Sequence, residues 1–451
     1  MGKGESVSPL FTDFYEITMA AGYFEHDMTA EATFSVFIRA GDRDRGYFVS
    51  AGLEDVLDIL SSYAFSKQDI EYLKGSGKFS KAFLSFLADL RFNGDVVAMP
   101  EGTVFFAEEP FLEITAPIIE AQLIETVVLN TLGFQTMIAT KAARCMQSAQ
   151  GRPLIDFSLR RTHAYDAGMK AARSTWIAGF TGTSNVLAGE QLGIPVSGTM
   201  AHSFVNAFES ELDAFIAYAE MFPDSTVLLV DTYDLAEGTR NAVKVAEYLR
   251  EKGAALQGVR LDSGDMVAGS RNAREILDRA GFPEVKIFAS SGFDEYKIAE
   301  IIEEGAVIDA FGVGTKVGVS ADSPFLDIVY KLVKFGDRNI KKLSPGKTTL
   351  AGQKQVFRKS AADGSLVEDI LGTRDESLES TTQLLVPVMK AGRLLKPHPS
   401  LSDIRSGLIQ NISTLSRRCR ALDQSVDYPV KISDRLSLLQ RTLNVGPGGF
   451  N

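Results

Sequence analysis

Cysteine is scarce in this sequence, and its scarcity limits the chemistry that the chain can perform. The 451 residues include two cysteines, Cys145 and Cys419, which lie far apart and form no Cys-x-x-Cys motif. A cysteine-based zinc ribbon or a dithiol redox centre is therefore excluded. Isolated cysteines are typical of proteins in a reducing compartment, so we expect a cytoplasmic protein.

Long apolar runs and an excess of basic residues are missing as well. No stretch approaches the roughly 18 apolar residues of a membrane-spanning helix, and the first residues lack the apolar region of a signal peptide. The net charge is −11, whereas a nucleic-acid-binding face needs basic residues. We therefore expect neither membrane nor nucleic acid as a partner, and any phosphate must be bound by local groups.

Apolar, β-branched runs alternate with helical patterns through the middle of the chain. The runs start roughly 25 to 40 residues apart, about the length of a βα unit. They cover residues 153–159, 195–201, 225–233, 256–265, 285–293 and 308–316. Strands that are buried on both faces and joined by helices form a parallel sheet. The pattern predicts a closed or nearly closed α/β barrel over residues 141–324.

The segments on either side of this barrel have a different character. Residues 1–140 mix helical and strand patterns. Residues 325–451 contain hairpin-like runs separated by turn signals such as Ala361-Ala-Asp-Gly364, and then a helical stretch over residues 400–422. We interpret residues 1–140 and 325–451 together as one second domain of mixed α/β type.

Polar side chains follow each barrel run at the point where it ends. They are Arg160, Arg161, Thr199, His202, Asp231, Asp234, Arg260, Asp262, Asp265, Ser290, Ser291, Thr315 and Lys316. The carboxyl ends of the strands carry the active site in α/β barrels. Cations, carboxylates and hydroxyl groups at successive ends are typical of a site for a phosphorylated substrate. This setting favours a catalytic role for His202 over that of a packed core histidine.

Two glycine-containing turns are candidates for phosphate binding. Gly312-Val-Gly314-Thr315-Lys-Val-Gly318 is one residue too long for a dinucleotide-binding fingerprint, and no acidic ribose ligand follows at the expected place. Backbone amides at such a strand-to-helix turn can still hold phosphate. Ser290-Ser291-Gly292 offers a second turn of this kind.

Asp262 and Asp265 lie on either side of a tight turn and allow two interpretations. A helix N-cap followed by a solvated acid is a common arrangement. Alternatively, the two carboxylates contact ribose hydroxyls or Mg²⁺, which binds through one or two carboxylates together with substrate phosphates. The other strand-end residues favour the second interpretation.

Five segments resemble the motifs of nicotinate phosphoribosyltransferases, in the order found in that family. They are Leu10-Phe-Thr-Asp-Phe-Tyr15, Phe157-Ser-Leu-Arg160-Arg161, Gly198-Thr-Met-Ala-His202-Ser203, Arg260-Leu-Asp262-Ser-Gly-Asp265 and Gly312-Val-Gly314-Thr315. Each motif alone is a weak signal. Together they extend the resemblance over nearly the whole chain.

The resemblance implies a type II phosphoribosyltransferase with an irregular parallel α/β barrel and a mixed α/β domain. It implies a homodimer whose active sites are shared between subunits. The expected reaction joins nicotinate to phosphoribosyl pyrophosphate and gives nicotinate mononucleotide and pyrophosphate, in the salvage branch of NAD biosynthesis. ATP hydrolysis is coupled through a phosphohistidine, with Mg²⁺ as cofactor, and His202 matches the phosphorylated position.

The same comparison implies roles for individual residues. Tyr15 and Phe157 stack on the pyridine ring, and Arg160, Thr199 and Arg260 lie near it. Asp262 and Asp265 face the ribose and bind the metal, as catalytic residues. Phosphate is held by Ser290, Ser291, Gly292, Gly312, Gly314 and Thr315. Some relatives carry a cysteine-rich metal module near the C-terminus; this chain cannot, so we expect no zinc.

Three alternatives stay open. A nicotinamide phosphoribosyltransferase also has the histidine but binds a neutral amide. A quinolinate phosphoribosyltransferase needs a more basic pocket for two carboxylates and lacks the histidine step. A barrel that only binds a nucleotide, without catalysis, is the alternative from a different class.

Overall fold

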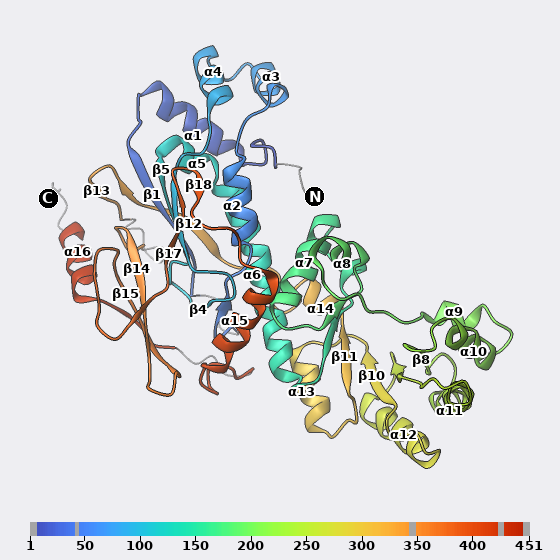
Figure 1. The fold of residues 1–451 in the computed structure, drawn as a ribbon. Helices are drawn as coiled ribbons and strands as arrows, with labels where there is room; N and C mark the ends of the chain where they lie inside the picture. The colour runs from blue at the N-terminus through green and yellow to red at the C-terminus, as the bar shows by residue number, and fades with distance from the viewer. Residues whose placement is uncertain (1–6, 41–44, 342–348, 423–427, 445–451) are drawn as a thin grey trace. The chain divides into compact units, whose positions relative to one another are not determined.

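The computed structural model describes residues 7–40, 45–341, 349–422 and 428–444, which Figure 1 draws as a coloured ribbon. The chain divides into two compact units. Ile138–Pro324 forms the central unit, and Met1–Met137 with Phe325–Asn451 forms the flanking unit. Helix α6 (Glu125–Ser148) contributes residues to both units.

The central unit contains a six-stranded parallel sheet in the order β7-β6-β11-β10-β9-β8. The strands are β6 (Leu154–Asp156), β7 (Gly182–Thr183), β8 (Val227–Leu229), β9 (Gly258–Leu261), β10 (Lys286–Ser290) and β11 (Ala310–Val313). Val196 adds an isolated parallel bridge to Thr183, beyond β7. No ladder within residues 138–324 joins β8 to this bridge, so the ring of strands is incomplete. The parallel sheet and its intervening helices confirm the predicted α/β class.

One of the predicted strands is wrong. Residues 195–201 form only the bridge at Val196, and β7 takes the place beside β6. Pro195 has no N–H for a ladder, although its carbonyl accepts a hydrogen bond from the Thr183 N–H at 3.0 Å. Gly182-Thr183 was not predicted, because two residues with no apolar run carry no strand pattern.

Helices connect the strands of the central unit, and side-chain caps fix where many of them begin. The helices are η1 (Leu159–Arg161), α7 (Tyr165–Ile177), α8 (Val186–Leu192), α9 (His202–Asn206), α10 (Glu211–Met221), α11 (Leu235–Glu251), α12 (Met266–Arg279), α13 (Glu295–Glu303) and α14 (Thr315–Gly318). Asp234, Asp265 and Asp294 cap α11, α12 and α13. Each such cap typically contributes about 1 kcal/mol. Helix α11 buries Val245 and Leu249, as its amphipathic pattern predicts.

The flanking unit combines strands from both ends of the chain. Its seven-stranded sheet has the order β13-β12-β1-β5-β3-β17-β18, a four-stranded sheet has the order β16-β14-β15-β19, and β2 pairs with β4. The strands are β1 (Glu31–Ile38), β2 (Phe48–Val49), β3 (Asp95–Ala98), β4 (Val104–Phe105), β5 (Leu112–Pro117), β12 (Ile328–Phe335), β13 (Arg338–Asn339), β14 (Lys354–Ser360), β15 (Leu366–Thr373), β16 (Thr382–Gln383), β17 (Val386–Lys390), β18 (Arg393–Leu394) and β19 (Val430–Ile432). Strand β1 lies between β12 and β5, so the N-terminal and C-terminal segments share one sheet.

Aromatic and aliphatic side chains form the core of the flanking unit. Phe34 on β1 stacks on Tyr330 of β12 with ring centroids 4.5 Å apart. The helices are α1 (Phe14–Glu25), α2 (Leu53–Ser61), α3 (Lys67–Gly75), α4 (Lys81–Asp89), α5 (Ile118–Leu123), α15 (Leu401–Ser413) and α16 (Asp434–Asn444). Helix α2 turns Val56, Leu57 and Leu60 into this core. Among the described residues, no helix has the length and apolar character needed to cross a bilayer.

Candidate active site

A cavity of about 430 Å³ opens in the central unit, within the size range of small-molecule sites. Five of the six parallel strands and the segment after the Val196 bridge contribute its walls. The lining residues are Ile155, Phe157, Val196, Ser197, Gly198, Thr199, Tyr218, Phe222, Ser225, Val227, Arg260, Phe288, Ala289 and Gly312. Most of these groups are apolar, while Thr199 and Arg260 supply polar contacts. Such a lining suits a flat, largely apolar ring that carries one charged substituent.

The ring of Phe157 packs against Gly312 of the neighbouring strand β11. A Cβ atom added to Gly312 would lie 2.4 Å from Cδ2 and Cε2 of Phe157. A Cβ atom on Gly314 would lie 3.1 Å from the Phe157 carbonyl oxygen, and one on Gly318 would lie 2.5 Å from Cβ of Ser158. Close packing therefore explains these glycines without a ligand. The predicted phosphate contacts of Gly312 and Gly314 stay predictions.

A buried carboxylate holds the turn that follows β6. Asp156 accepts hydrogen bonds from the Ser158 N–H and from the Thr183 hydroxyl, both at 2.8 Å. Burial raises the pKa of Asp156, and the hydrogen bonds from Ser158 and Thr183 oppose that rise. This network orients Phe157 and leads into η1, where Arg160 is exposed to solvent. The sequence pattern did not single out Asp156, because a strand-end aspartate does not reveal a partner 27 residues away.

Arg260 on β9 has hydrogen-bonding capacity that the protein does not use. Its Nη1 donates to the Thr199 hydroxyl. Its Nε is buried and has no hydrogen-bond partner within the described residues. Burial lowers the pKa of this guanidinium, Asp262 and Asp231 raise it, and nearby Arg160 lowers it further. The cavity therefore contains a cation with an unused donor, which suits a carboxylate ligand.

His202 begins α9 and lies between two polar groups. Its Nδ1 is 3.1 Å from the Thr232 hydroxyl oxygen, and its Nε2 is 3.8 Å from Oδ2 of Asp262. The histidine side chain is 40% exposed, so a reagent can reach the ring. The structure thus brings together His202 and Asp262, two residues that the sequence analysis had placed at the ends of different runs. Thr232 was not among the predicted residues.

Asp231 is a site residue to which the sequence analysis gave no role. Its Oδ2 accepts hydrogen bonds from the Asp262 N–H at 2.8 Å and from the Ser263 hydroxyl at 2.6 Å. Its Oδ1 is buried and, within the described part of the chain, has no partner. Ser290 donates to Oδ1 of Asp262, which completes the group. The available signal was the position of Asp231 directly after the β8 run.

Asp265 has the local role that the sequence analysis weighed first. Its Oδ1 accepts hydrogen bonds from the N–H groups of Val267 and Ala268, at 2.9 and 3.0 Å, and so caps α12. No hydrogen bond or ion pair within the central unit joins it to Asp262 or Asp231. The catalytic and metal-binding roles of Asp265 stay predictions.

The two predicted phosphate turns lie after β10 and β11. Ser291 has a φ of 153° and Gly292 a φ of 59°, so two successive residues adopt positive φ. A non-glycine residue in such a conformation is strained and often belongs to a functional turn. Thr315 begins α14 in the second turn. Lys316 beside it pairs with Asp294 at 2.7 Å, and this ion pair connects the two turns.

Tyr15 belongs to the flanking unit, at the start of α1. It is 48% exposed. Partial burial and the carboxylates of Glu125, Glu16 and Asp13 raise the pKa of its hydroxyl, so the phenol is neutral near pH 7. The predicted stacking of Tyr15 on a pyridine ring stays a prediction.

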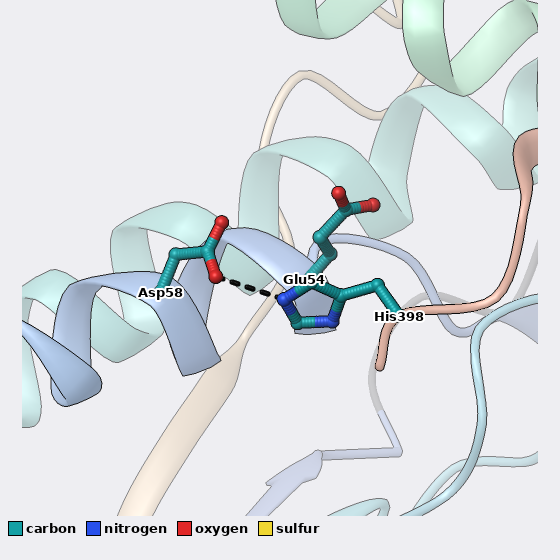
Figure 2. Close-up of side chains that lie close together, drawn as sticks. All are labelled: Glu54, Asp58 and His398. Carbon is teal, nitrogen blue, oxygen red and sulfur yellow. Dashed lines mark hydrogen bonds and ion pairs between the residues drawn. The ribbon is translucent and has the colours of Figure 1, made fainter. Parts of the chain in front are cut away.

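Figure 2 shows the one group of three possible metal ligands found among the described residues, Glu54, Asp58 and His398 of the flanking unit. Nε2 of His398 lies 2.8 Å from Oδ1 of Asp58, so this contact ties the segment before α15 to α2. The group includes neither Asp262 nor Asp265. We interpret it as a surface ion pair with an additional acid nearby.

Comparisons with known proteins extend over both units. Models of the nicotinate phosphoribosyltransferase N-terminal domain, family and C-terminal domain match residues 10–133, 153–355 and 377–440. Nicotinate phosphoribosyltransferase pncB2 of Mycobacterium tuberculosis is 47% identical over 438 residues, which cover 97% of this chain and 94% of that protein. Nicotinate phosphoribosyltransferase of Bacillus subtilis is 38% identical over 463 residues, which cover 96% of this chain and 94% of that protein.

The fold also matches a solved structure whose name is similar to those of the two relatives. The crystal structure of human nicotinic acid phosphoribosyltransferase aligns with a TM-score of 0.86 and 29% identity, and the alignment covers 96% of this chain and 99% of that chain. Three consecutive family models and two relatives above 30% identity cover almost the whole sequence. Together with the site geometry they show that the chain belongs to the nicotinate phosphoribosyltransferase family.

Proposed function

We propose that this protein joins nicotinate to phosphoribosyl pyrophosphate, giving nicotinate mononucleotide and pyrophosphate as a salvage step of NAD biosynthesis. The pyridine nitrogen forms a bond to ribose C1 while the bond from C1 to the pyrophosphate oxygen breaks. The pyridine nitrogen already carries a lone pair, so the step needs no strong general base. Catalysis then depends on positioning and on stabilising charge.

The cavity in the central unit is the proposed nicotinate site. Phe157 offers an aromatic face for the pyridine ring, and Gly312 behind it leaves room for that face. Arg260 has a buried, unused Nε–H, and Thr199 already accepts a hydrogen bond from its Nη1. The nicotinate carboxylate is an acceptor that would satisfy this donor, with Arg160 as a second nearby cation. This unused donor in a mostly apolar cavity is the observation that carries the proposal.

ATP use is proposed through phosphorylation of His202. The bond from the γ-phosphorus of ATP to its bridging oxygen breaks, a bond from phosphorus to a ring nitrogen forms, and ADP leaves. Nδ1 lies within hydrogen-bonding distance of Thr232, so Nε2 is the nitrogen we assign as nucleophile. The phosphohistidine is later hydrolysed to phosphate. Its added negative charge lies close to Asp262 and would alter the binding of substrate and product phosphates.

The donor set beside His202 fits a magnesium ion. Mg²⁺ prefers carboxylate oxygens together with substrate phosphates. The unpaired, buried Oδ1 of Asp231 and the adjacent Asp262 are suitable ligands, whereas Oδ1 of Asp265 already caps a helix. When bound, the ion would neutralise negative charge on the pyrophosphate group. The protein groups alone hold Asp262 in place, through its N–H to Asp231 and its Oδ1 to Ser290.

A pyrophosphate-release assay with nicotinate, nicotinamide and quinolinate, each with and without ATP, tests this function. We expect release with nicotinate, a gain with ATP, and weaker or no release with the other two bases. Preference for nicotinamide or quinolinate would favour the corresponding alternative enzyme. No release with any base, despite binding of a nucleotide, would favour the non-catalytic barrel.

We also propose that the active enzyme is a homodimer in which Tyr15 of one subunit covers the cavity of the other. A two-fold dimer makes two such sites from one self-complementary interface, and an aromatic lid would exclude water. Tyr15→Ala and His202→Ala chains should each be nearly inactive. Co-refolded, they should recover up to about a quarter of wild-type activity by random pairing. No recovery despite demonstrated subunit mixing would contradict a shared site.

A further inference from the structure

A second cavity, of about 540 Å³, lies in the flanking unit and is not explained by the proposed reaction. Its walls come from β12, β13, the ends of β14 and β15, and α16. The charged and polar lining groups are Lys334, Asn339, Gln353, Thr373, Arg374, Asp375 and Arg435. The volume is large enough for a nucleotide-sized or smaller molecule.

The charges around this cavity are mostly positive. Three cations, Lys334, Arg374 and Arg435, line it together with one carboxylate, Asp375. The whole chain has a net charge of −11, so this local excess is opposite in sign to the overall charge. Asp375 pairs with Arg435, but their side chains are 67% and 55% exposed, so solvent weakens the pair. A ligand could therefore compete with Asp375 for Arg435.

Arg374 is held in position from behind the cavity. Its Nη2 pairs with the fully buried carboxylate of Glu113. The same carboxylate also pairs with Lys354, whose Nζ lies 3.2 Å from Oε1. One buried carboxylate is thus shared by two basic groups, and burial lowers the pKa of the Lys354 ammonium while Glu113 opposes that shift. Because the guanidinium is already fixed, binding a ligand to its remaining N–H groups would cost little side-chain entropy.

Lys334, unlike Arg374, is a cation of this cavity that no buried carboxylate of the described residues holds in position. It is half-buried on β12, and no carboxylate in the described ranges forms an ion pair with it. Gln353 lies beside it, with Nε2 bonded to the Thr33 and Thr115 hydroxyls at 3.0 and 3.2 Å, so this amide is also fixed. The cavity thus combines an unpaired ammonium with a pre-positioned guanidinium, beside an amide whose Nε2 is already engaged.

We propose that this cavity binds a small phosphorylated anion, at a site separate from the reaction in the central unit. Guanidinium and ammonium groups in one concave site are the usual partners of phosphate oxygens. The concave shape and the negative overall charge disfavour an extended polyanion such as nucleic acid. This proposal does not depend on the proposed activity.

Titration calorimetry of the full-length protein with inorganic pyrophosphate, in EDTA, tests the site. Under these conditions the wild type should bind pyrophosphate in the flanking unit. The double variant Lys334→Ala/Arg435→Ala should weaken that binding at least about 10-fold, since it removes two charge-assisted contacts. Both residues lie at the cavity surface, and Arg374 with its buried partner stays intact. The matched control Lys431→Ala, which removes a surface lysine of the same unit, should change binding less than about 2-fold.

Binding in the central unit is separated by the Ser290→Ala/Ser291→Ala variant, which alters the predicted phosphate turn after β10 and should keep the pyrophosphate site described here. If Lys334→Ala/Arg435→Ala binds like the wild type while remaining folded by circular dichroism, the proposal is wrong. Equal weakening by Lys431→Ala would also overturn it, because the effect would then be one of general charge. Tighter binding of succinate than of pyrophosphate would overturn the assignment to phosphate chemistry. If the wild-type protein binds pyrophosphate in the flanking unit but shows no activity in the pyrophosphate-release assay, only the proposed function is contradicted.

Discussion

Two clusters of charged residues in the central unit differ in how fully they are paired. On α6 and α13, the buried carboxylate of Glu295 pairs with Lys141 at 2.5 Å and with Arg144 at 2.9 Å. Near the cavity, Arg260 keeps a buried Nε–H and Asp231 keeps a buried Oδ1 without partners among the described residues. Unpaired buried polar atoms cost free energy, and beside a cavity a bound ligand can supply the missing partner. The difference separates a cluster that stabilises the fold from one that is prepared for a ligand.

The largest expected effect is on catalysis and comes from a change beside the cavity of the central unit. His202→Asn should keep the fold, because the side chain is part-exposed at a helix start and not core packing. It should abolish ATP hydrolysis and the ATP-dependent gain in nucleotide synthesis, while slow synthesis without ATP persists. ATPase and pyrophosphate-release assays measure both effects. Normal ATPase activity in this variant would rule out the phosphohistidine.

The fully paired cluster should respond through stability instead. Glu295→Gln removes the carboxylate that Lys141 and Arg144 share, leaving Lys141 with Asp322 at 2.7 Å, and breaking a buried ion pair costs about 3 to 5 kcal/mol. We expect a large drop in the urea midpoint with unchanged nicotinate KM in the folded fraction. Glu300→Gln on the same helix, where the pair with Lys297 is exposed, should shift stability by less than about 1 kcal/mol. Similar urea midpoints for Glu295→Gln and Glu300→Gln would show that the buried ion pairs contribute no more stability than the exposed pair.

A third kind of buried charge sharpens the comparison. Glu16 is fully buried on α1 and accepts hydrogen bonds from the hydroxyls of Thr12 and Thr126. Within the described ranges it forms no ion pair with a cation. Burial raises its pKa from 4.5 to about 7 despite these hydrogen bonds. The folded state therefore binds more protons than the unfolded state between about pH 4.5 and 7. The free energy of unfolding should fall as pH rises through this window. Above the window, the destabilisation caused by the ionised Glu16 should stay constant.

Glu16→Gln should remove that pH dependence. At pH 8 the variant should be more stable than the wild type by roughly 2 to 3 kcal/mol, and the difference should disappear near pH 4. Urea unfolding at several pH values measures it. Glu25→Gln, at the exposed end of the same helix, is the control and should run parallel to the wild type. A parallel curve for Glu16→Gln as well would show that Glu16 is already ionised in the folded protein.

Among these predictions, the smallest free-energy change is expected for recognition of the nicotinate carboxylate. Arg260→Ala removes the proposed charge-assisted contact with the nicotinate carboxylate, and loss of such a contact typically costs about 1.5 to 3 kcal/mol. The nicotinate KM should rise about 10- to 150-fold, and the preference for nicotinate over nicotinamide should shrink. Steady-state kinetics with both bases measures the ratio. An unchanged ratio would exclude Arg260 from this role.

The sequence alone was sufficient where the signal is local. Apolar periodicity predicted β8 to β11 and α11, because burial on one face imposes a fixed spacing on neighbouring residues. The ends of those runs pointed to His202, Arg260 and Asp262, whose roles stay predictions, and ordered motifs identified the family. Local signal failed at residues 195–201 and at β7, where pairing and not composition makes the strand.

Only the tertiary structure decided which side chains meet. Asp231 reaches the backbone of Asp262 from a different strand, and Thr183 reaches Asp156 across 27 residues. It also showed that Gly312 packs against Phe157, and it settled that Asp265 caps α12, one of the two interpretations that the sequence had left open. Parallel strands bring residues from distant parts of the chain to one edge. Contacts at that edge depend on register and side-chain direction, which no local pattern in the sequence encodes.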